Sequence, residues 1–548
     1  MEKKCLSDLP RVAVEYIDSV IKAMKYRRNV RIEVRQELID HFADALADCK
    51  TNDEKQKLAE ELIAEFGDVK LLGTLLRRAK KRCRPLWRTM VARAFQLVGV
   101  LFVLLVLYIG WFFSGKPVIT TNYLEVLNRQ VRPVADDSQN AWPFYKQAVE
   151  KYVQYEANEE REKFDFRNPS TLSTEERGFV QKSISGNQQS LDLIRQGNQR
   201  PYYWPVYDVQ EGQNPELIAI SIPHLKEYRR LAELLCWQGL LSAEAGRLDK
   251  AFQEVLESYS FGKHLRGQHT MLIEQLVAIA LEAMSTKTLR IVLSEYGEHI
   301  DAAILEAARK RFEAEIADED FTADFDGEKL FIYDEIQRSF TQSRIGKSHL
   351  YIKRLEQNVP ALAFGAQGKL VKHWFRILFT HPGKEETLKM SEEFYSAIKA
   401  NAGKTPAEIK LLGTETKADK IEKEIFNDNI FLGLLMPAFN AVISRTYRNR
   451  IDSEATLTVL AILEYQKQKG VLPENLNVLV EDGLLKEIPI DPFSDKPLVY
   501  KKTDGGFTLY SVGLNFMDDG GTRSKDSHDR PALWGEGGDA VFWPVTDS

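Results

Sequence analysis

A short alternating acidic run, Asp324, Asp326 and Glu328, is interrupted by Phe325 and Gly327. Carboxylates at alternate positions beside a glycine match the opening spacing of a helix–loop–helix calcium loop. The further alternating ligands and the closing glutamate at the right distance are missing. We therefore predict that this run is not a calcium site.

No set of residues indicates catalysis. His264 and His269 are five residues apart, which places them on different faces of a helix. The chain contains no HExxH, GxSxG, Walker A or dinucleotide-binding glycine motif. Enzymes also assemble sites from residues far apart in sequence, so the sequence leaves enzymatic activity open while favouring its absence.

The cysteines do not indicate a redox or zinc site. Cys5, Cys49 and Cys83 precede a long apolar run, Cys236 follows it, and none belongs to a CxxC pair. We predict that Cys236 is a buried packing residue and that core burial stabilises the region around it.

The charge of the chain is distributed unevenly. Residues 1–93 carry 21 Lys and Arg against 15 Asp and Glu, a net charge of +6. The remaining residues carry 53 basic and 65 acidic side chains, a net charge of −12. An acidic domain offers no general attraction to phosphate backbones, which argues against nucleic acid as a partner.

The apolar run from Ala94 to Phe113 predicts a transmembrane helix. Its 20 residues include no charge, and Gln96 is its only strongly polar side chain. A helix of this length covers roughly 30 Å, the thickness of the hydrocarbon core. A cleaved signal peptide would lie nearer the N-terminus, so we expect a permanent anchor.

Basic residues predict the orientation of this helix. Lys116 is the only base in the dozen residues after it, and the bases before it are Arg77, Arg78, Lys80, Lys81, Arg82, Arg84, Arg88 and Arg93. The positive-inside rule then places the N-terminus in the cytoplasm and the C-terminal part outside it.

Residues 1–80 predict a small helical bundle, with helices over Val12–Met24, Arg31–Cys49 and Asp53–Phe66, and Gly67 as a C-terminal cap. Tyr16–Ile17, Glu37-Leu38-Ile39-Asp40-His41 and Phe66-Gly67-Asp68 resemble the HAAS, or permease-prefix, family of bacterial helical modules. This resemblance implies a regulatory or protein-binding role that is not catalytic, and it makes His41 a helix-surface or packing residue.

Residues 140–450 predict a large helical domain, joined to the membrane segment by a connector at 114–139. The expected helices include Ile222–Gly246, Asp249–Leu265, Leu272–Tyr296 and Ala302–Ile316. Gly239, Gly246 and Ala251 match the small-residue positions of a tetratricopeptide hairpin, the alternative being an ordinary helical hairpin. The polar stretches Asn158–Glu175 and Lys384–Asp419 are expected to be loops.

Residues 451–548 predict an α+β cap in which a helix, Ser453–Lys469, precedes short alternating segments. Proline on both sides of Asp491 excludes helix there, so its carboxylate can hold a turn by accepting backbone N–H groups. The residues that define the pattern are Tyr465, Gly470, Pro473, Leu476, Leu479, Val480, Leu484, Leu485, Pro489, Ile490, Asp491, Pro492, Phe493, Pro497, Leu498, Val499, Tyr500, Gly506, Phe507 and Leu509–Gly513.

This succession resembles the soluble part of type II secretion major pseudopilins. In that family the loop after the last strands binds calcium, and the corresponding residues here are Asn515, Asp518, Asp519 and Asp539. Oxygen ligands in a glycine-containing loop suit Ca²⁺, so the resemblance implies a calcium site, the alternative being a solvated acidic loop. Calcium is the only cofactor that the sequence suggests.

The arrangement departs from a pseudopilin, because the apolar helix lies some 340 residues before the cap and follows a separate head. Filament assembly is therefore not the expected role. The whole chain resembles multi-domain membrane proteins of planctomycete-type bacteria that join a helical region to such a cap.

Together these features predict a mainly α protein with six segments: a helical head at 1–80, a basic juxtamembrane segment at 81–93, a transmembrane helix at 94–113, the connector, the helical domain and the cap. The expected function is a single-pass scaffold at the cytoplasmic membrane, with protein partners on both sides and lipid around residues 94–113. The alternatives are a component of a secretion or pseudopilus-like system and an extracytoplasmic hydrolase.

Overall fold

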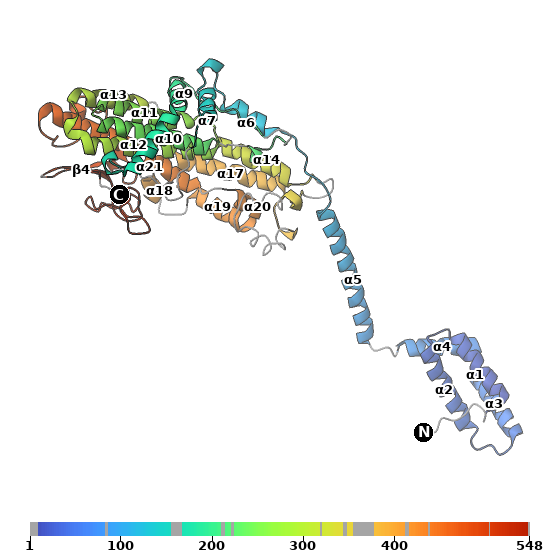
Figure 1. The fold of residues 1–548 in the computed structure, drawn as a ribbon. Coiled ribbons are helices and arrows are strands. Elements are labelled where there is room, and N and C mark those ends of the chain that lie inside the picture. Colours follow the sequence, from blue (N-terminus) through green and yellow to red (C-terminus); the bar gives the residue numbers. More distant parts are fainter. Residues whose placement is uncertain are drawn as a thin grey trace. The chain divides into compact units, whose positions relative to one another are not determined.

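The computed structural model describes residues 9–82, 86–154, 167–209, 214–220, 224–317, 321–342, 348–354, 378–411, 416–436, 439–503 and 505–545. The chain divides into two compact units, which we describe separately: unit 1, Met1–Trp111, and unit 2, Phe112–Ser548. The described residues are mainly α-helical, as predicted, and their five short strands all follow residue 489 (Figure 1).

Unit 1 begins with four helices, which we call the head: α1 (Arg11–Met24), α2 (Arg28–Ala45), α3 (Asn52–Phe66) and α4 (Val69–Arg82). Val34, Leu38 and Phe42 recur every four residues and are buried together, as their spacing predicts. Gly67 ends α3 with a φ of +74°, which confirms the predicted cap. His41 is exposed on α2 and lies edge-on to Phe66 at 5.4 Å between ring centres, so it is a helix-surface residue with one aromatic contact.

Helix α5 (Leu86–Phe112) contains nearly all of the predicted apolar segment. Its stretch Met90–Phe112 has a mean hydropathy of 2.4, and none of its most apolar window is buried in the protein. A second stretch, Ile430–Lys469, is also long and apolar enough to cross a membrane, but half of its window is buried. Such burial is typical of a core helix in a folded domain.

Unit 2 starts with short elements around the predicted connector: α6 (Tyr123–Val131), the 3₁₀ turn Asp137–Gln139, α7 (Trp142–Glu150), α8 (Thr174–Gly186) and α9 (Gln188–Asn198). Leu127 and Val131 of α6 are buried beside Trp204 and Tyr207, so the connector is packed into unit 2. Of the predicted loop at 158–175, residues up to 166 lie outside the described part, and α8 begins at Thr174.

Four longer helices form the centre of unit 2: α10 (Leu225–Glu244), α11 (Leu248–Leu265), α12 (Leu272–Tyr296) and α13 (Ala302–Ile316). A Cβ on Gly239 would lie 2.5 Å from Cγ2 of Val255, so α10 and α11 cross as closely as the predicted hairpin requires. Gly246, with a φ of +74°, provides the left-handed turn between them. Cys236 is fully buried on α10, as predicted.

The next helices are α14 (Asp326–Ser339), α17 (Lys384–Ala402), α18 (Pro406–Leu411), α19 (Lys417–Asp428) and α20 (Ile430–Leu435). The prediction of a loop over Lys384–Asp419 is therefore wrong. The buried face of α17 contains the polar residues Thr387 and Ser391 beside Phe394 and Ile398, so the apolar periodicity of a helix is weak in the sequence. Thr416 and Asp419 cap α19 reciprocally, a local signal that outweighs the polar composition.

Helix α21 (Phe439–Lys469) and helix α22 (Asn477–Glu481) precede the strands β1 (Ile490–Asp491), β2 (Lys496–Pro497), β3 (Val499–Thr503), β4 (Gly506–Ser511) and β5 (Ala540–Trp543). β1 and β2 pair as one antiparallel ribbon, and β3-β4-β5 form an antiparallel sheet with an irregularity at Leu509/Tyr510. The predicted α+β character of this region is confirmed.

One core joins the helices to the cap. The predicted boundary at 450/451 falls inside α21, whose buried Ile451 and Leu460 share a hydrophobic cluster with Val255, Val292 and Phe542 of β5. Residues 112–548 accordingly form one compact unit.

Asp491 holds its turn as predicted. Its Oδ1 accepts hydrogen bonds from the N–H of Phe493 at 3.0 Å and from Oγ of Ser511 at 2.8 Å. Its Oδ2 accepts from the N–H of Val512 at 3.0 Å and from Oγ of Ser494 at 3.2 Å. These bonds tie the β1–β2 ribbon to the end of β4.

Candidate metal centre

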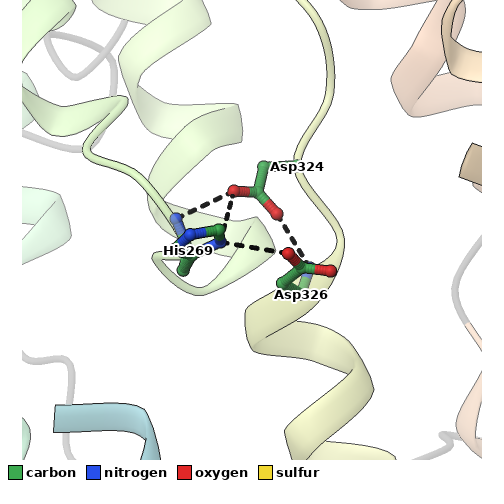
Figure 2. Close-up of side chains that lie close together, drawn as sticks. All are labelled: His269, Asp324 and Asp326. Carbon is green, nitrogen blue, oxygen red and sulfur yellow. Dashed lines mark hydrogen bonds and ion pairs between the residues drawn. The ribbon is translucent and has the colours of Figure 1, made fainter. Parts of the chain in front are cut away.

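Three side chains from two distant segments meet near the start of α14. His269 lies in the turn between α11 and α12, and Asp324 and Asp326 lie just before and at the first residue of α14 (Figure 2). We call these residues the metal cluster. Within the described part of the chain, they are the one group of three His, Cys, Asp or Glu side chains whose ligand atoms all lie within 4.8 Å of one another.

The two carboxylates converge on one imidazole nitrogen. Nδ1 of His269 lies 3.0 Å from Oδ2 of Asp324 and 3.1 Å from Oδ2 of Asp326. The three side chains are each about one-third exposed, at 33%, 29% and 31% for His269, Asp324 and Asp326. The cluster is therefore open to solvent on one side and enclosed on the other.

Asp324 is fixed by hydrogen bonds on all sides. Its Oδ2 accepts from the N–H of His269 at 2.9 Å, and its Oδ1 accepts from the N–H of Asp326 at 2.8 Å. Gln275 holds its backbone, with Oε1 accepting the N–H of Asp324 and Nε2 donating to its carbonyl. This carboxylate therefore needs little reorganisation to present its oxygens.

The backbone conformation at two positions brings the segments together. His269 has a φ of +60°, which turns the chain sharply after α11. A Cβ on Gly327 would lie 2.6 Å from the carbonyl oxygen of Thr270 and 2.8 Å from that of His269. Only glycine fits there, because the start of α14 lies directly against the turn.

The chemistry of the cluster depends on the proton of His269. Without a proton on Nδ1, the imidazole and one oxygen from each aspartate make a three-ligand N/O set that suits a divalent transition ion, with water completing the coordination. When the imidazole is positively charged, His269 forms ion pairs with both carboxylates. In either state Lys399 adds a weak ion pair to Asp326 at 3.8 Å. Metal titration separates these two states.

Two carboxyl groups with raised pKa values lie close in sequence to the cluster. Burial raises the pKa of Glu274 to about 7, against the opposing effect of hydrogen bonds from Tyr207, Tyr203 and the N–H of Met271. Burial likewise raises the pKa of Glu328 to about 7, although the N–H of Leu272 opposes it. Carboxyl groups with such pKa values exchange protons near neutral pH, which is a frequent property of functional sites.

The predicted calcium ligands lie together in the cap, in what we call the cap loop, residues 511–521 with Asp539. Oδ1 and Oδ2 of the buried Asp539 accept the N–H groups of Asp519 at 3.1 Å and Gly521 at 2.7 Å. Oδ1 of Asp518 accepts from Oη of Tyr510 and the N–H of Gly520, and Oδ2 of Asp519 accepts from Nδ2 of Asn515.

These contacts bring the four predicted residues into one loop, but their oxygens bond to protein donors. Asp518, Asp519 and Asp539 do not gather their ligand atoms as the metal cluster does. Calcium binding by the cap loop stays a prediction.

His264, the other histidine considered from the sequence, lies elsewhere in the core. Its Nδ1 is 2.6 Å from Oη of Tyr145, and burial, assisted by the charge of Lys263, lowers its pKa to about 4. His264 is thus a neutral packing residue at physiological pH, separate from His269.

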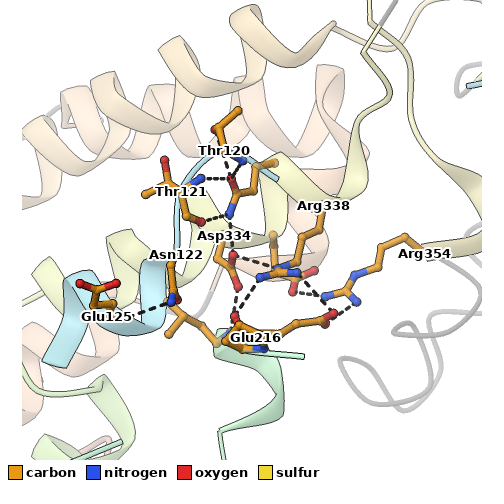
Figure 3. A network of polar contacts seen from close by, with 12 residues as sticks. Thr120, Thr121, Asn122, Glu125, Glu216, Asp334, Arg338 and Arg354 are labelled. Atoms are coloured by element: carbon orange, nitrogen blue, oxygen red, sulfur yellow. Dashed lines mark hydrogen bonds and ion pairs between the residues drawn. The ribbon is translucent and has the colours of Figure 1, made fainter. Parts of the chain in front are cut away.

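A buried polar network fixes the chain after α5 to α14 (Figure 3). Oε1 of Gln337 accepts the N–H groups of Thr120 and Thr121, both at 3.2 Å, and its Nε2 donates to Oδ1 of Asp334. Arg338 binds Asp334 at 2.9 Å, and Arg354 bridges Glu216 and Glu335 at 2.6 Å each. The segment that leaves α5 is therefore firmly attached to unit 2.

Comparison of the chain with protein families, with curated proteins and with solved structures finds no match.

The acidic run at 324–328 and His269 can both be identified from the sequence, but the sequence does not predict that they lie together in space. They are 55 residues apart, and no single-sequence pattern pairs two segments over that distance. Gly267 and Gly327, each beside a helix end, were the available signals of a close approach.

Proposed function

We propose that the chain is a single-pass membrane protein that holds unit 2 outside the cytoplasm as a scaffold for protein partners, with the head inside. The observation that carries this proposal is the exposed apolar surface of α5. Leu97, Phe102 and Leu104 are 64%, 64% and 56% exposed, and water-exposed apolar surface of this extent is rare in soluble proteins. A bilayer covers it without any further partner.

Charge supports the direction of crossing. Basic side chains from Arg77 to Arg93 precede the apolar stretch, and the region beyond it is acidic. This is the distribution that the positive-inside rule associates with a cytoplasmic N-terminus.

Reporter fusions test the topology. Alkaline phosphatase, which is active only outside the cytoplasm, should be active when fused after residue 130 and inactive when fused after residue 60. The reverse pattern would invert the proposed topology, and inactivity at both sites would remove the crossing.

The scaffold role rests on the architecture of unit 2. The α10–α11 hairpin packs through Gly239 in the manner of helical repeats, whose usual role is protein binding. The network around Gln337 fixes residues 120 and 121 within this unit.

Crosslinking in cells with mass spectrometry tests that role. Peptides of unit 2 should be crosslinked to extracytoplasmic proteins and peptides of the head to cytoplasmic ones. Crosslinks from unit 2 to cytoplasmic proteins, or none to any protein, would reject it.

A second candidate is a metal-dependent extracytoplasmic hydrolase. The metal cluster favours it, because a divalent ion held by three protein ligands would keep an open position at which water can be activated. With added Zn²⁺ or Mn²⁺, the purified chain would hydrolyse 4-nitrophenyl esters, and Asp324→Asn would abolish this. Equal activity in Asp324→Asn and in the cap control Asp519→Asn would reject the candidate.

A further inference from the structure

A cavity of about 440 Å³ lies within unit 2, between α12, α21 and the end of the cap. Its volume falls within the range of small-molecule sites, roughly 300–1,000 Å³. Because all its walls belong to unit 2, the inference below does not depend on the proposed membrane topology. We call this cavity the basic pocket.

The charge of the basic pocket is opposite to that of its surroundings. Five basic side chains line it, Lys287, Arg290, Arg445, Arg448 and Arg523, against one carboxylate, Asp452. Asp452 is already paired, since its Oδ1 lies 2.8 Å from Nη1 of Arg290. The chain after residue 93 is net acidic, so this local excess of positive charge is not a property of the whole surface.

Within the described part of the chain, the other four bases have no carboxylate counter-charge. Among the described residues, no carboxylate forms an ion pair with Lys287, Arg445, Arg448 or Arg523. Arg523 donates to the carbonyl oxygens of Val541 and Pro544, which orients it without cancelling its charge. Lys287, Arg448 and Arg523 are half-buried, whereas Arg445 is exposed. Half-buried like charges that lie close together are stabilised when an anion joins them.

Arg448 shows the need for a partner most directly. Its Nη2 donates to Oγ of Ser444 at 3.3 Å, but its buried Nε has no hydrogen-bond partner. Burial, and after it the nearby charge of Arg445, lowers the pKa of Arg448. The positive charge of this half-buried guanidinium is one that a carboxylate or phosphoryl group would neutralise.

Asn449 adds an unused acceptor to the same wall. Only 3% of its surface is exposed, and its Nδ2 donates to Oε2 of Glu282. Its Oδ1 has no hydrogen-bond partner.

The remaining wall is apolar and aromatic. Trp534 and Phe542 line the pocket, and the guanidinium carbon of Arg448 lies 5.9 Å from the ring centre of Trp534. A flat or aliphatic ligand body can pack there while its acid group reaches the arginines.

We propose that the basic pocket binds a small organic anion, with its carboxylate or phosphoryl group on Arg448 and its neighbours and its apolar body against Trp534. The role of Arg445, Arg523 and Lys287 is to supply further positive charge around the acid group.

Calorimetric titration of the detergent-solubilised full chain tests this with four probes: benzoate, phenyl phosphate, inorganic phosphate and neutral benzamide. Benzoate and phenyl phosphate should bind, phenyl phosphate more tightly than inorganic phosphate, and benzamide not at all. Added salt should weaken the binding of both organic anions.

Variants separate the pocket from general effects. Arg448→Gln should weaken the binding of phenyl phosphate at least about tenfold, because it removes a charged hydrogen-bond donor. Arg448→Lys keeps the positive charge but loses the planar guanidinium that can form two parallel hydrogen bonds, so it should bind with intermediate affinity. Arg450→Gln, a matched change on the same helix at a residue paired with Glu454, should bind as the native chain does.

Stability without ligand distinguishes a binding role from a structural one. If Arg448 is held for a ligand, Arg448→Gln should leave the unfolding temperature of the free chain unchanged or raise it. A lower unfolding temperature would indicate a structural role. Absence of binding by both organic anions, equal binding of benzamide, or undiminished binding by Arg448→Gln would each overturn the proposal.

Discussion

The metal cluster and the cap loop both place aspartates beside glycines, yet their carboxylates are used differently. In the cap loop, backbone N–H groups, Tyr510 and Asn515 donate to the carboxylate oxygens. In the metal cluster, one oxygen from each aspartate points at the same nitrogen of His269. The local donors, and not the acidic composition, decide whether carboxylates hold a turn or converge into a site.

Asp539 tests the structural side of this comparison and should give the largest effect. Asp539→Ala removes a buried carboxylate and leaves the part-buried N–H groups of Asp519 and Gly521 without their acceptors, which should cost roughly 4 kcal/mol of unfolding free energy. Asp519→Ala, an exposed change in the same loop, should cost under about 0.5 kcal/mol. Chemical denaturation measures both, and similar losses would contradict the assigned role of Asp539.

Glu274 gives the region of the metal cluster a characteristic pH dependence. Its pKa in the folded chain is raised to about 7, so folding favours the protonated form. Its contribution to stability is complete below the unfolded pKa, near 4.5, and is lost as pH rises through 7. The loss should reach about 3 kcal/mol.

Denaturation of the native chain and of Glu274→Gln at pH 5 and pH 8 measures that loss. The substitution should flatten the dependence, because the amide does not titrate. An unchanged slope would assign the pH dependence to another group, with Glu328 as the next to substitute.

Metal binding tests the other side of the comparison. Zn²⁺ or Mn²⁺ at about one hundred times its dissociation constant should stabilise the native chain by roughly 2.7 kcal/mol. Asp324→Asn should abolish the effect and Asp519→Asn should keep it. If all three chains respond alike, the ion binds elsewhere.

Calcium should give the smallest effect and act on the cap loop alone. Ca²⁺ at about ten times its dissociation constant should stabilise the chain by roughly 1.4 kcal/mol. The effect should persist in Asp324→Asn and disappear in Asp518→Asn. An unfolding temperature that does not change with Ca²⁺ would leave the cap loop as a solvated acidic loop.

Local patterns predicted much of the fold. The observed bounds of α12 and α13 agree with the periodicity, and Asp491 holds its turn because the flanking prolines leave few alternatives. The loop prediction at 384–419 failed because α17 buries Thr387 and Ser391, whose polarity hides the helical face.

The sites were less predictable than the elements. The cap loop ligands come mostly from one continuous segment, so sequence could group them. His269 meets Asp324 only because the start of α14 lies against the turn between α11 and α12. The basic pocket takes its charges from α12, α21 and Arg523, which lies between β4 and β5. Its net charge is positive, whereas that of the chain after residue 93 is negative.

The contacts of α21 constrain the order in which unit 2 can fold. Oη of Tyr259 hydrogen-bonds to Oγ of Ser453, 194 residues later, and Arg309 pairs with Glu464, 155 residues later. The chain leaves the ribosome N-terminus first. The apolar faces of α11 to α13 that pack on α21 therefore stay exposed until α21 has been synthesised. Such long sequence separations slow folding, and the nascent chain during this interval is a natural client for chaperones.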